Sequence, residues 1–300
     1  MKPKFTSTFR AGCQLFGGAV CAGAVLLIAA SAPAQNLFEA DFHSGNIYEL
    51  TPNGGSTTFA SGLDAPLGLA FNSAGDLFVS DQNSGNIYEF TPGGAQSTFA
   101  SGLSNPQGLA FNSAGNLFEA DNSGNIYEFT PNGESTTFGS GLNDPAGLAF
   151  NSAGNLFEAD SHSGNIYEFT PGGAKSTFAS GLGVPAGLAF NSAGNLFESD
   201  WGSGNIYEFT PNGGSTTFAS GLDAPWGLAF NSAGDLFEAD EYSGNIYEFT
   251  PNGGSTTFAS GLNNAVGLAF QPVPEPSTWL MVAMGIGAVL GGLRLRRRSS

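Results

Sequence analysis

The sequence predicts an all-β protein, a ring of six blades with four strands each, from three observations. A unit of about 40 residues recurs six times, and the motif Asn-Leu-Phe-Glu-Ala-Asp or a close variant begins at residues 36, 76, 116, 155, 195 and 235. Each copy holds four short strand-like pieces separated by turn residues. No apolar pattern of helical period appears in any copy. Repeats of this kind are typical of a β-propeller, whose blades bury their apolar faces against their neighbours.

In the first copy the predicted strands cover residues 37–40, 47–50, 56–60 and 68–71. The segments between them are rich in Gly, Asn, Pro and Ser, which are the residues that form tight turns. We expect Pro52 and Pro66 to lie outside the strands, because proline lacks the N–H group that a sheet ladder needs.

The phase of the repeat predicts how the ring closes. The array opens on a second-strand motif at residue 37 and ends on a Gly-Leu-Ala-Phe motif at residues 267–270. If Gly-Leu-Ala-Phe is the innermost strand of each blade, the first copy lacks its own, and the last copy can supply it. We therefore expect three N-terminal strands and one C-terminal strand to share the first blade, which leaves the ring without a free edge.

The N-terminus has the pattern of a secretory signal. Basic residues precede an apolar run over residues 17–30, and Ala32-Pro33-Ala34 offers a small-residue cleavage site. This predicts a signal peptide over residues 1–35. The two cysteines, Cys13 and Cys21, both lie within it, so the mature chain would have no disulfide and no thiol catalysis.

The C-terminus has three parts in order. Val273-Pro274-Glu275-Pro276 precedes an apolar stretch over residues 279–293, and four arginines follow within the last seven residues. This arrangement resembles the PEP-CTERM sorting tail of exopolysaccharide-producing Gram-negative bacteria. The resemblance implies export to the cell envelope, outer surface or extracellular space, with an exosortase-type protease as processing partner. An apolar helix of this length spans about 22 Å, which is short for a bilayer and predicts a transient anchor over residues 273–300. Both hydrophobic helices are expected to lie outside the propeller.

The charge of the repeat region limits its partners. Between the two ends there are 24 acidic residues and one basic residue, Lys175, for a net charge near −23. Binding to nucleic acid requires clustered Lys and Arg side chains, so nucleic acid is excluded as a partner.

The repeat pattern Pro-x-Gly-Leu-Ala-Phe, followed by Asn-Leu-Phe-x-Ala-Asp and Ser-Gly-Asn-Ile-Tyr-Glu-Phe, resembles NHL-type repeats over residues 36–270. It is also broadly similar to the gluconolactonase and virginiamycin-lyase propellers. The resemblance implies a six-bladed propeller domain over residues 36–272. It also leaves open an enzyme of the gluconolactonase or lyase type.

The copies differ mainly in two segments, one after the Asp that ends the second-strand motif and one before Gly-Leu-Ala-Phe. Because strands alternate in direction within a blade, we expect both segments on one face of the ring. Loops on a rigid scaffold commonly carry specificity, although neutral drift after duplication would also concentrate change there. Aromatic side chains in these segments suit stacking on sugars or anchoring a protein. The candidate ligand-binding residues are Phe42, His43, Leu67, Trp201, Trp226 and Tyr242.

The acidic residues and histidines complete the candidates. An Asp ends the second-strand motif in every copy, and five copies also carry a Glu inside it, where the second copy has Val79. The Asp residues suit turn capping, and calcium is the alternative, with oxygen ligands from several loops. His43 and His162 occupy equivalent positions in opposite blades, so we expect no shared metal. No nucleophile with an adjacent base is visible, which disfavours an enzyme. The sequence thus favours an exported binder of exopolysaccharide, matrix or an envelope protein; the alternatives are a propeller enzyme or a spacer.

Overall fold

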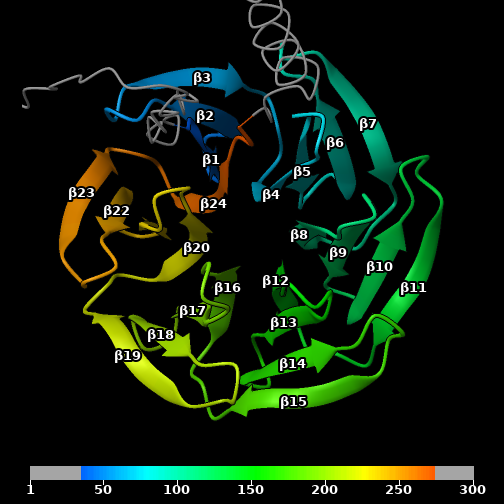
Figure 1. The fold of residues 1–300 in the computed structure, drawn as a ribbon. Coiled ribbons are helices and arrows are strands. Elements are labelled where there is room, and N and C mark those ends of the chain that lie inside the picture. Colours follow the sequence, from blue (N-terminus) through cyan, green and yellow to red (C-terminus); the bar gives the residue numbers. More distant parts are fainter. Residues whose placement is uncertain (1–34, 274–300) are drawn as a thin grey trace, which may run out of the picture. The chain divides into compact units, whose positions relative to one another are not determined.

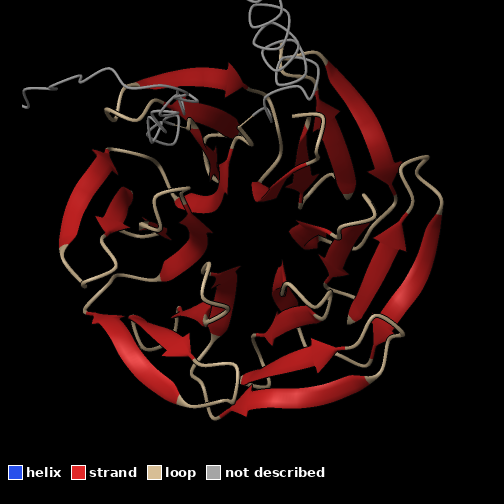
Figure 2. Ribbon diagram, in the orientation of Figure 1, coloured by secondary structure: helices blue, strands red, loops and turns tan. Residues whose placement is uncertain are grey.

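The computed structural model describes residues 35–273, which form 24 β-strands and, within that range, no helix (Figures 1 and 2). No helix among these residues is long and apolar enough to cross a membrane. Apart from Gln35 and Val273, the predicted signal peptide and sorting tail, with the two hydrophobic helices expected in them, fall outside the described residues.

The strands form six antiparallel four-stranded sheets arranged around a common centre (Figure 1). The innermost strands are β24 (Ala265–Phe270), β4 (Pro66–Phe71), β8 (Pro106–Phe111), β12 (Pro145–Phe150), β16 (Pro185–Phe190) and β20 (Pro225–Phe230). The second strands are β1 (Leu37–Asp41), β5 (Leu77–Asp81), β9 (Leu117–Asp121), β13 (Leu156–Asp160), β17 (Leu196–Asp200) and β21 (Leu236–Asp240).

The outer half of each blade is equally regular. The third strands are β2 (Asn46–Leu50), β6 (Asn86–Phe90), β10 (Asn125–Phe129), β14 (Asn165–Phe169), β18 (Asn205–Phe209) and β22 (Asn245–Phe249). The outermost strands are β3 (Ser56–Ala60), β7 (Gln96–Ser101), β11 (Ser135–Ser140), β15 (Lys175–Ser180), β19 (Ser215–Ser220) and β23 (Ser255–Ser260). We number the blades in chain order, so blade 1 contains β24, β1, β2 and β3, and blade 6 contains β20 to β23. The predicted six-bladed, four-stranded architecture is confirmed.

Blade 1 combines strands from the two ends of the described chain. β24 pairs antiparallel with β1, with Phe270 opposite Leu37 and Leu268 opposite Glu39. A backbone bond of 3.0 Å from Gln271 N to Asn36 O extends the pairing beyond the strands. β24 also packs against the innermost strands on either side, β20 and β4.

The apolar core lies between blades. One cluster joins Phe38 and Ile47 of blade 1 to Leu77 and Phe90 of blade 2, and equivalent clusters recur around the ring. The Phe of each second strand meets two other rings edge-on, one in its own blade and one in the next, as Phe38 meets Phe59 at 5.0 Å and Phe71 of β4 at 5.1 Å. Such aromatic contacts contribute roughly 0.5–1.5 kcal/mol each beyond the area they bury. Because both faces of every blade are covered, the second strands are buried at every position.

Glycine in the innermost strands allows neighbouring blades to meet at the centre. A Cβ atom on Gly267 would lie 2.0 Å from the carbonyl oxygen of Leu67 in β4, and one on Gly227 would lie 2.0 Å from that of Val266 in β24. The other four blade junctions show the same approach at 2.1–2.2 Å. Only glycine fits so close to a neighbouring backbone.

One prediction about the strands is wrong. Pro66 does not lie outside the sheet but is the first residue of β4, where it stands opposite Asp81. The register shifts between Pro66 and Leu69, so the proline occupies an irregular end of the ladder. The first position of a strand tolerates proline because the missing N–H falls where the ladder begins.

Candidate functional site on the variable face

The two variable segments of each blade lie side by side. The backbone N–H of the residue after the Asp that ends each second strand donates to a carbonyl in the segment before an innermost strand, as in Phe42 to Asn264 at 3.0 Å and Trp201 to Val184 at 2.9 Å. We call the face that carries these segments the variable face. The opposite face carries the Asn-Ser-Ala-Gly loops between first and second strands and is called the uniform face. The predicted gathering of variable segments within each blade is confirmed.

The Asp at the end of each second strand joins these two segments. Asp41, for example, accepts hydrogen bonds from Ser44 N at 3.0 Å and from Asn263 N at 2.6 Å. All six of these Asp residues are almost fully buried. The backbone bonds satisfy the carboxylates without a cation, so turn capping accounts for them. Within residues 35–273 no group of three or more His, Cys, Asp or Glu residues is arranged to hold a metal ion.

Blades 5 and 6 share an aromatic and polar cluster. The rings of Trp201 and Tyr242 meet edge-on with centroids 5.8 Å apart. Trp201 Nε1 donates to Glu241 Oε2 at 2.7 Å, and Asn264 Nδ2 donates to Glu241 Oε1 at 3.0 Å. Tyr242 is 60% exposed and is the most exposed large apolar side chain among the described residues. We call Trp201, Glu241, Tyr242 and Asn264 the aromatic cluster.

Trp226 and Leu67 point elsewhere. They line a cavity of about 110 Å³ at the centre of the ring, bounded by the residue before the Gly, the Gly and the Leu of all six innermost strands. Leu67 is buried in the apolar cluster between blades 1 and 2, and Trp226 packs against the same cluster. Gln107 contributes the one amide side chain of the lining and stands three blades from Trp226.

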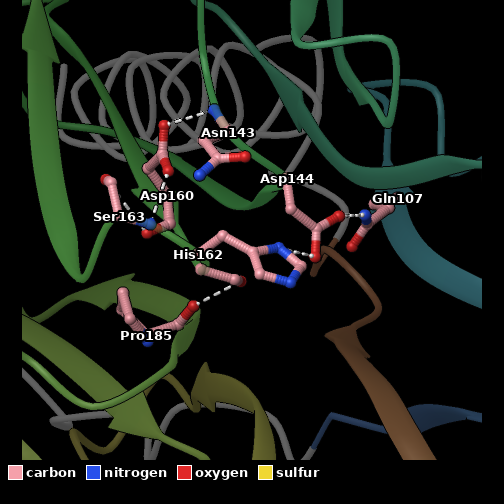
Figure 3. A network of polar contacts seen from close by, with 8 residues as sticks. Gln107, Asn143, Asp144, Asp160, His162, Ser163 and Pro185 are labelled. Atoms are coloured by element: carbon pink, nitrogen blue, oxygen red, sulfur yellow. Dashed lines mark hydrogen bonds and ion pairs between the residues drawn. The ribbon is translucent and has the colours of Figure 1, made fainter.

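A second polar network runs from the central cavity to the surface of blade 4 (Figure 3). Gln107 Nε2 donates to Asp144 Oδ1 at 2.9 Å, and Asp144 Oδ2 lies 2.9 Å from His162 Nδ1. The histidine ring is 69% exposed. A carboxylate at Nδ1 holds the proton on that nitrogen and leaves Nε2 able to accept another. The sequence analysis missed this network because its three residues belong to three different repeats.

The remaining candidates do not join either group. Phe42 packs against the apolar cluster between blades 1 and 2 and meets His43 edge-on at 5.5 Å. The structure therefore brings Trp201 and Tyr242 together, places Leu67 and Trp226 in the central cavity, and leaves Phe42 and His43 as a separate pair. The sequence analysis did not select Glu241 and Asn264 as site residues, because their contacts form only where blades 5, 6 and 1 meet.

Five glutamates of the second strands form a buried set. Glu39, Glu119, Glu158, Glu198 and Glu238 are 0% exposed, and neither carboxyl oxygen of any of them has a hydrogen-bond partner among the described residues. Burial raises the pKa of each well above its ordinary value of 4.5, and the Asp two residues later raises it further. In blade 2 the equivalent Val79 belongs to the apolar core. These glutamates therefore occupy apolar positions, where burial favours the neutral form of the carboxyl group.

Comparisons with known proteins agree with the fold and the tail. Residues 93–230 match the family described as the SMP-30/Gluconolactonase/LRE-like region, and residues 272–298 match the PEP-CTERM protein-sorting motif. No curated protein matches the chain. The tail motif implies export to the envelope of a Gram-negative bacterium and processing by an exosortase at the C-terminus.

Several solved structures share the architecture. A chain of a nidogen/laminin complex is 21% identical, with 80% of this chain and 99% of that chain covered and a TM-score of 0.73. A putative gluconolactonase is 18% identical over 70% of this chain and 82% of that one, with a TM-score of 0.62. A catalytically inactive histidine-to-alanine variant of virginiamycin B lyase from Staphylococcus aureus with quinupristin is 15% identical over 77% and 86%, with a TM-score of 0.60. At these identities the likeness shows the propeller fold alone. The chain is thus a six-bladed β-propeller with a PEP-CTERM sorting motif.

Proposed function

We propose that this protein is an exported binding protein of the cell envelope or extracellular matrix that holds exopolysaccharide through the variable face. In this proposal residues 1–35 are the signal peptide, residues 36–272 an NHL-type propeller domain, and residues 273–300 a sorting tail that anchors the chain until an exosortase removes it. The observation that carries the binding role is the aromatic cluster.

The chemistry of the aromatic cluster suits a hydroxyl-rich polymer. An exposed aromatic ring stacks on the apolar face of a sugar, and a neighbouring carboxylate and amide accept and donate hydrogen bonds to its hydroxyl groups. Glu241 is held by Trp201 and Asn264, so the cluster is ordered before a ligand arrives, which lowers the entropy cost of binding. With 24 acidic residues and one lysine in the repeat region, a neutral or calcium-bridged polysaccharide is favoured over a free polyanion.

Replacing Trp201 and Tyr242 together with Ala tests this role. Loss of the stacking surface is expected to weaken retention on the producer's own exopolysaccharide by roughly tenfold or more. Affinity electrophoresis of the purified protein measures the retention. The matched control is Asn83→Ala, which changes the position equivalent to Tyr242 in blade 2.

The outcome of a third variant, Trp226→Ala, locates the site. If retention depends on Trp226 and not on Trp201 and Tyr242, the polymer binds at the central cavity and the aromatic cluster is not the site. Unchanged retention in all variants, at a wild-type level measurable above an unrelated acidic protein, contradicts the polysaccharide proposal.

One observation favours an alternative enzyme of the gluconolactonase or lyase type. His162 is held by Asp144, which is the arrangement that orients a histidine as a general base. A histidine is also the residue replaced in the inactive virginiamycin B lyase variant with a similar fold. If the protein turns over a sugar lactone or quinupristin, His162→Ala is expected to reduce the rate by about 10²–10⁴. His43→Ala, at the equivalent position of blade 1, is expected to leave it unchanged. Absence of turnover by the wild-type protein removes this alternative.

A further inference from the structure

Both ends of the described chain leave the propeller on the uniform face. Leu37 begins β1 where Phe270 ends β24, and the two residues stand opposite each other. Beyond them Gln271 N donates to Asn36 O at 3.0 Å, and Gln35 Nε2 donates to Gln271 O at 2.9 Å. Gln35 Oε1 accepts from Ser232 N at 2.9 Å, and Ser232 lies in the Asn-Ser-Ala-Gly loop of blade 6. The pairing of β1 with β24 and the bond between Gln271 and Asn36 fix this exit, and in the full chain Gln35 adds a bond to the neighbouring blade.

The distance from this exit to the apolar part of the tail is short. The PEP-CTERM match begins at residue 272, directly after Gln271, and the apolar stretch begins at Trp279. The seven residues 272–278 can span at most about 25 Å even when fully extended. The C-terminal end leaves from β24, an innermost strand close to the centre of the ring (Figure 1).

The path from the exit around the outer edge of a blade to the variable face is longer than that reach. Crossing from the innermost to the outermost strand of a blade requires three inter-strand spacings, about 14 Å. Passing over the edge adds the length of a strand of five or six residues, which is about 17–20 Å. The connecting residues therefore cannot wrap around a blade and bring the variable face to the same side as the tail.

We infer that, while its tail is held in a membrane, the propeller presents the variable face away from that membrane and keeps the uniform face toward it. The inference rests on the proposed anchoring by residues 273–300 but not on the identity of the ligand. It assigns the aromatic cluster and the His162 network to the outward surface, where they can meet an extracellular polymer before the tail is cleaved.

Site-directed fluorescence tests this orientation. The full chain is prepared with Cys13→Ala and Cys21→Ala, and then with one further change, either Ser232→Cys on the uniform face or Ser243→Cys on the variable face. Both serines are exposed, and both lie in loops of blade 6, so the two variants differ mainly in the face that they report. Each cysteine is labelled with bimane, and the chain is reconstituted into phosphatidylethanolamine and phosphatidylglycerol vesicles that contain a headgroup-quencher lipid.

We expect loss of bimane fluorescence at the Ser232 position and none at the Ser243 position, relative to vesicles without the quencher lipid. Equal loss at both positions, or greater loss at Ser243, would overturn the orientation. No loss at either position would show that the tail does not hold the propeller at the bilayer, which also overturns it. None of these outcomes depends on polysaccharide binding, so this test and that of the proposed ligand can fail separately.

Discussion

The Glu198→Val variant is expected to be more stable than the wild-type protein, and the gain is expected to grow as the pH rises. The buried carboxyl of Glu198 has no hydrogen-bond partner among the described residues, and its pKa is raised by burial and then by Asp200. The same strand position in blade 2 is Val79, and the substitution converts Leu-Phe-Glu-Ser-Asp of β17 into the Leu-Phe-Val-Ser-Asp of β5. The apolar replacement therefore has a precedent in this fold.

The sign of the pH effect follows from proton binding. The folded-state pKa of each buried glutamate lies above its unfolded value, so the folded chain binds more protons than the unfolded chain once the pH exceeds about 4.5. The contribution of these groups to the free energy of unfolding is therefore fully present below that pH, and it is lost as the pH rises toward the raised pKa. Each group lowers it by about 1.4 kcal/mol for every pH unit over which the folded protein keeps its proton.

Urea unfolding at pH 4.5 and pH 8 measures this prediction. Glu198→Val should raise the midpoint concentration more at pH 8 than at pH 4.5. The reverse change, Val79→Glu, should lower it, again more at pH 8. Glu134→Gln is the control, because Glu134 is exposed in a turn and should change stability little at either pH. A pH-independent difference for Glu198→Val would show that its carboxyl reaches water or a partner in solution.

The Gly267→Ala variant is expected to lose much of its stability because β24 packs against the innermost strands of both neighbouring blades, β20 and β4. Its new Cβ atom would meet the carbonyl oxygen of Leu67, which belongs to the rigid backbone of β4 and cannot move aside without displacing the blade. We expect a loss of about 3 kcal/mol or more, as for other severe core strain. The contact between Gly267 and Leu67 joins blade 1 to blade 2, and equivalent contacts join the other blades. We infer that loss of this contact would open the ring between blades 1 and 2.

Thermal unfolding compares this variant with two others. Gly227→Ala, at the junction between blades 6 and 1, should cost a similar amount if all six junctions are equivalent. Gly172→Ala is the control, because a Cβ there meets only the Thr170 hydroxyl at 4.0 Å and the residue has no positive φ; it should be nearly neutral. If Gly267→Ala is as stable as Gly172→Ala, β24 does not lock the ring in solution.

The sequence by itself determined the number of blades, the four strands in each, and the pairing of the last Gly-Leu-Ala-Phe strand with the first repeat. These features follow from the repeat period and its phase, because each copy builds one local unit from turns and short strands. It also showed where the copies differ, and strand alternation was enough to place those differences on one face. The exception within the strands was Pro66, since a proline can begin a strand without breaking its ladder.

Only the tertiary structure decided which side chains meet across blades. The motif Leu-Phe-Glu-Ala-Asp mixes apolar and acidic residues, and nothing in it tells that Glu198 is as deeply buried as Phe197, because burial of both strand faces depends on the neighbouring blades. The Trp201–Glu241 hydrogen bond joins residues 40 positions apart in the sequence, and the Gln107–Asp144 hydrogen bond joins residues 37 positions apart. Such contacts are set by the packing and twist of one blade against the next. A repeat period specifies the blade, and the arrangement of the ring specifies the candidate site.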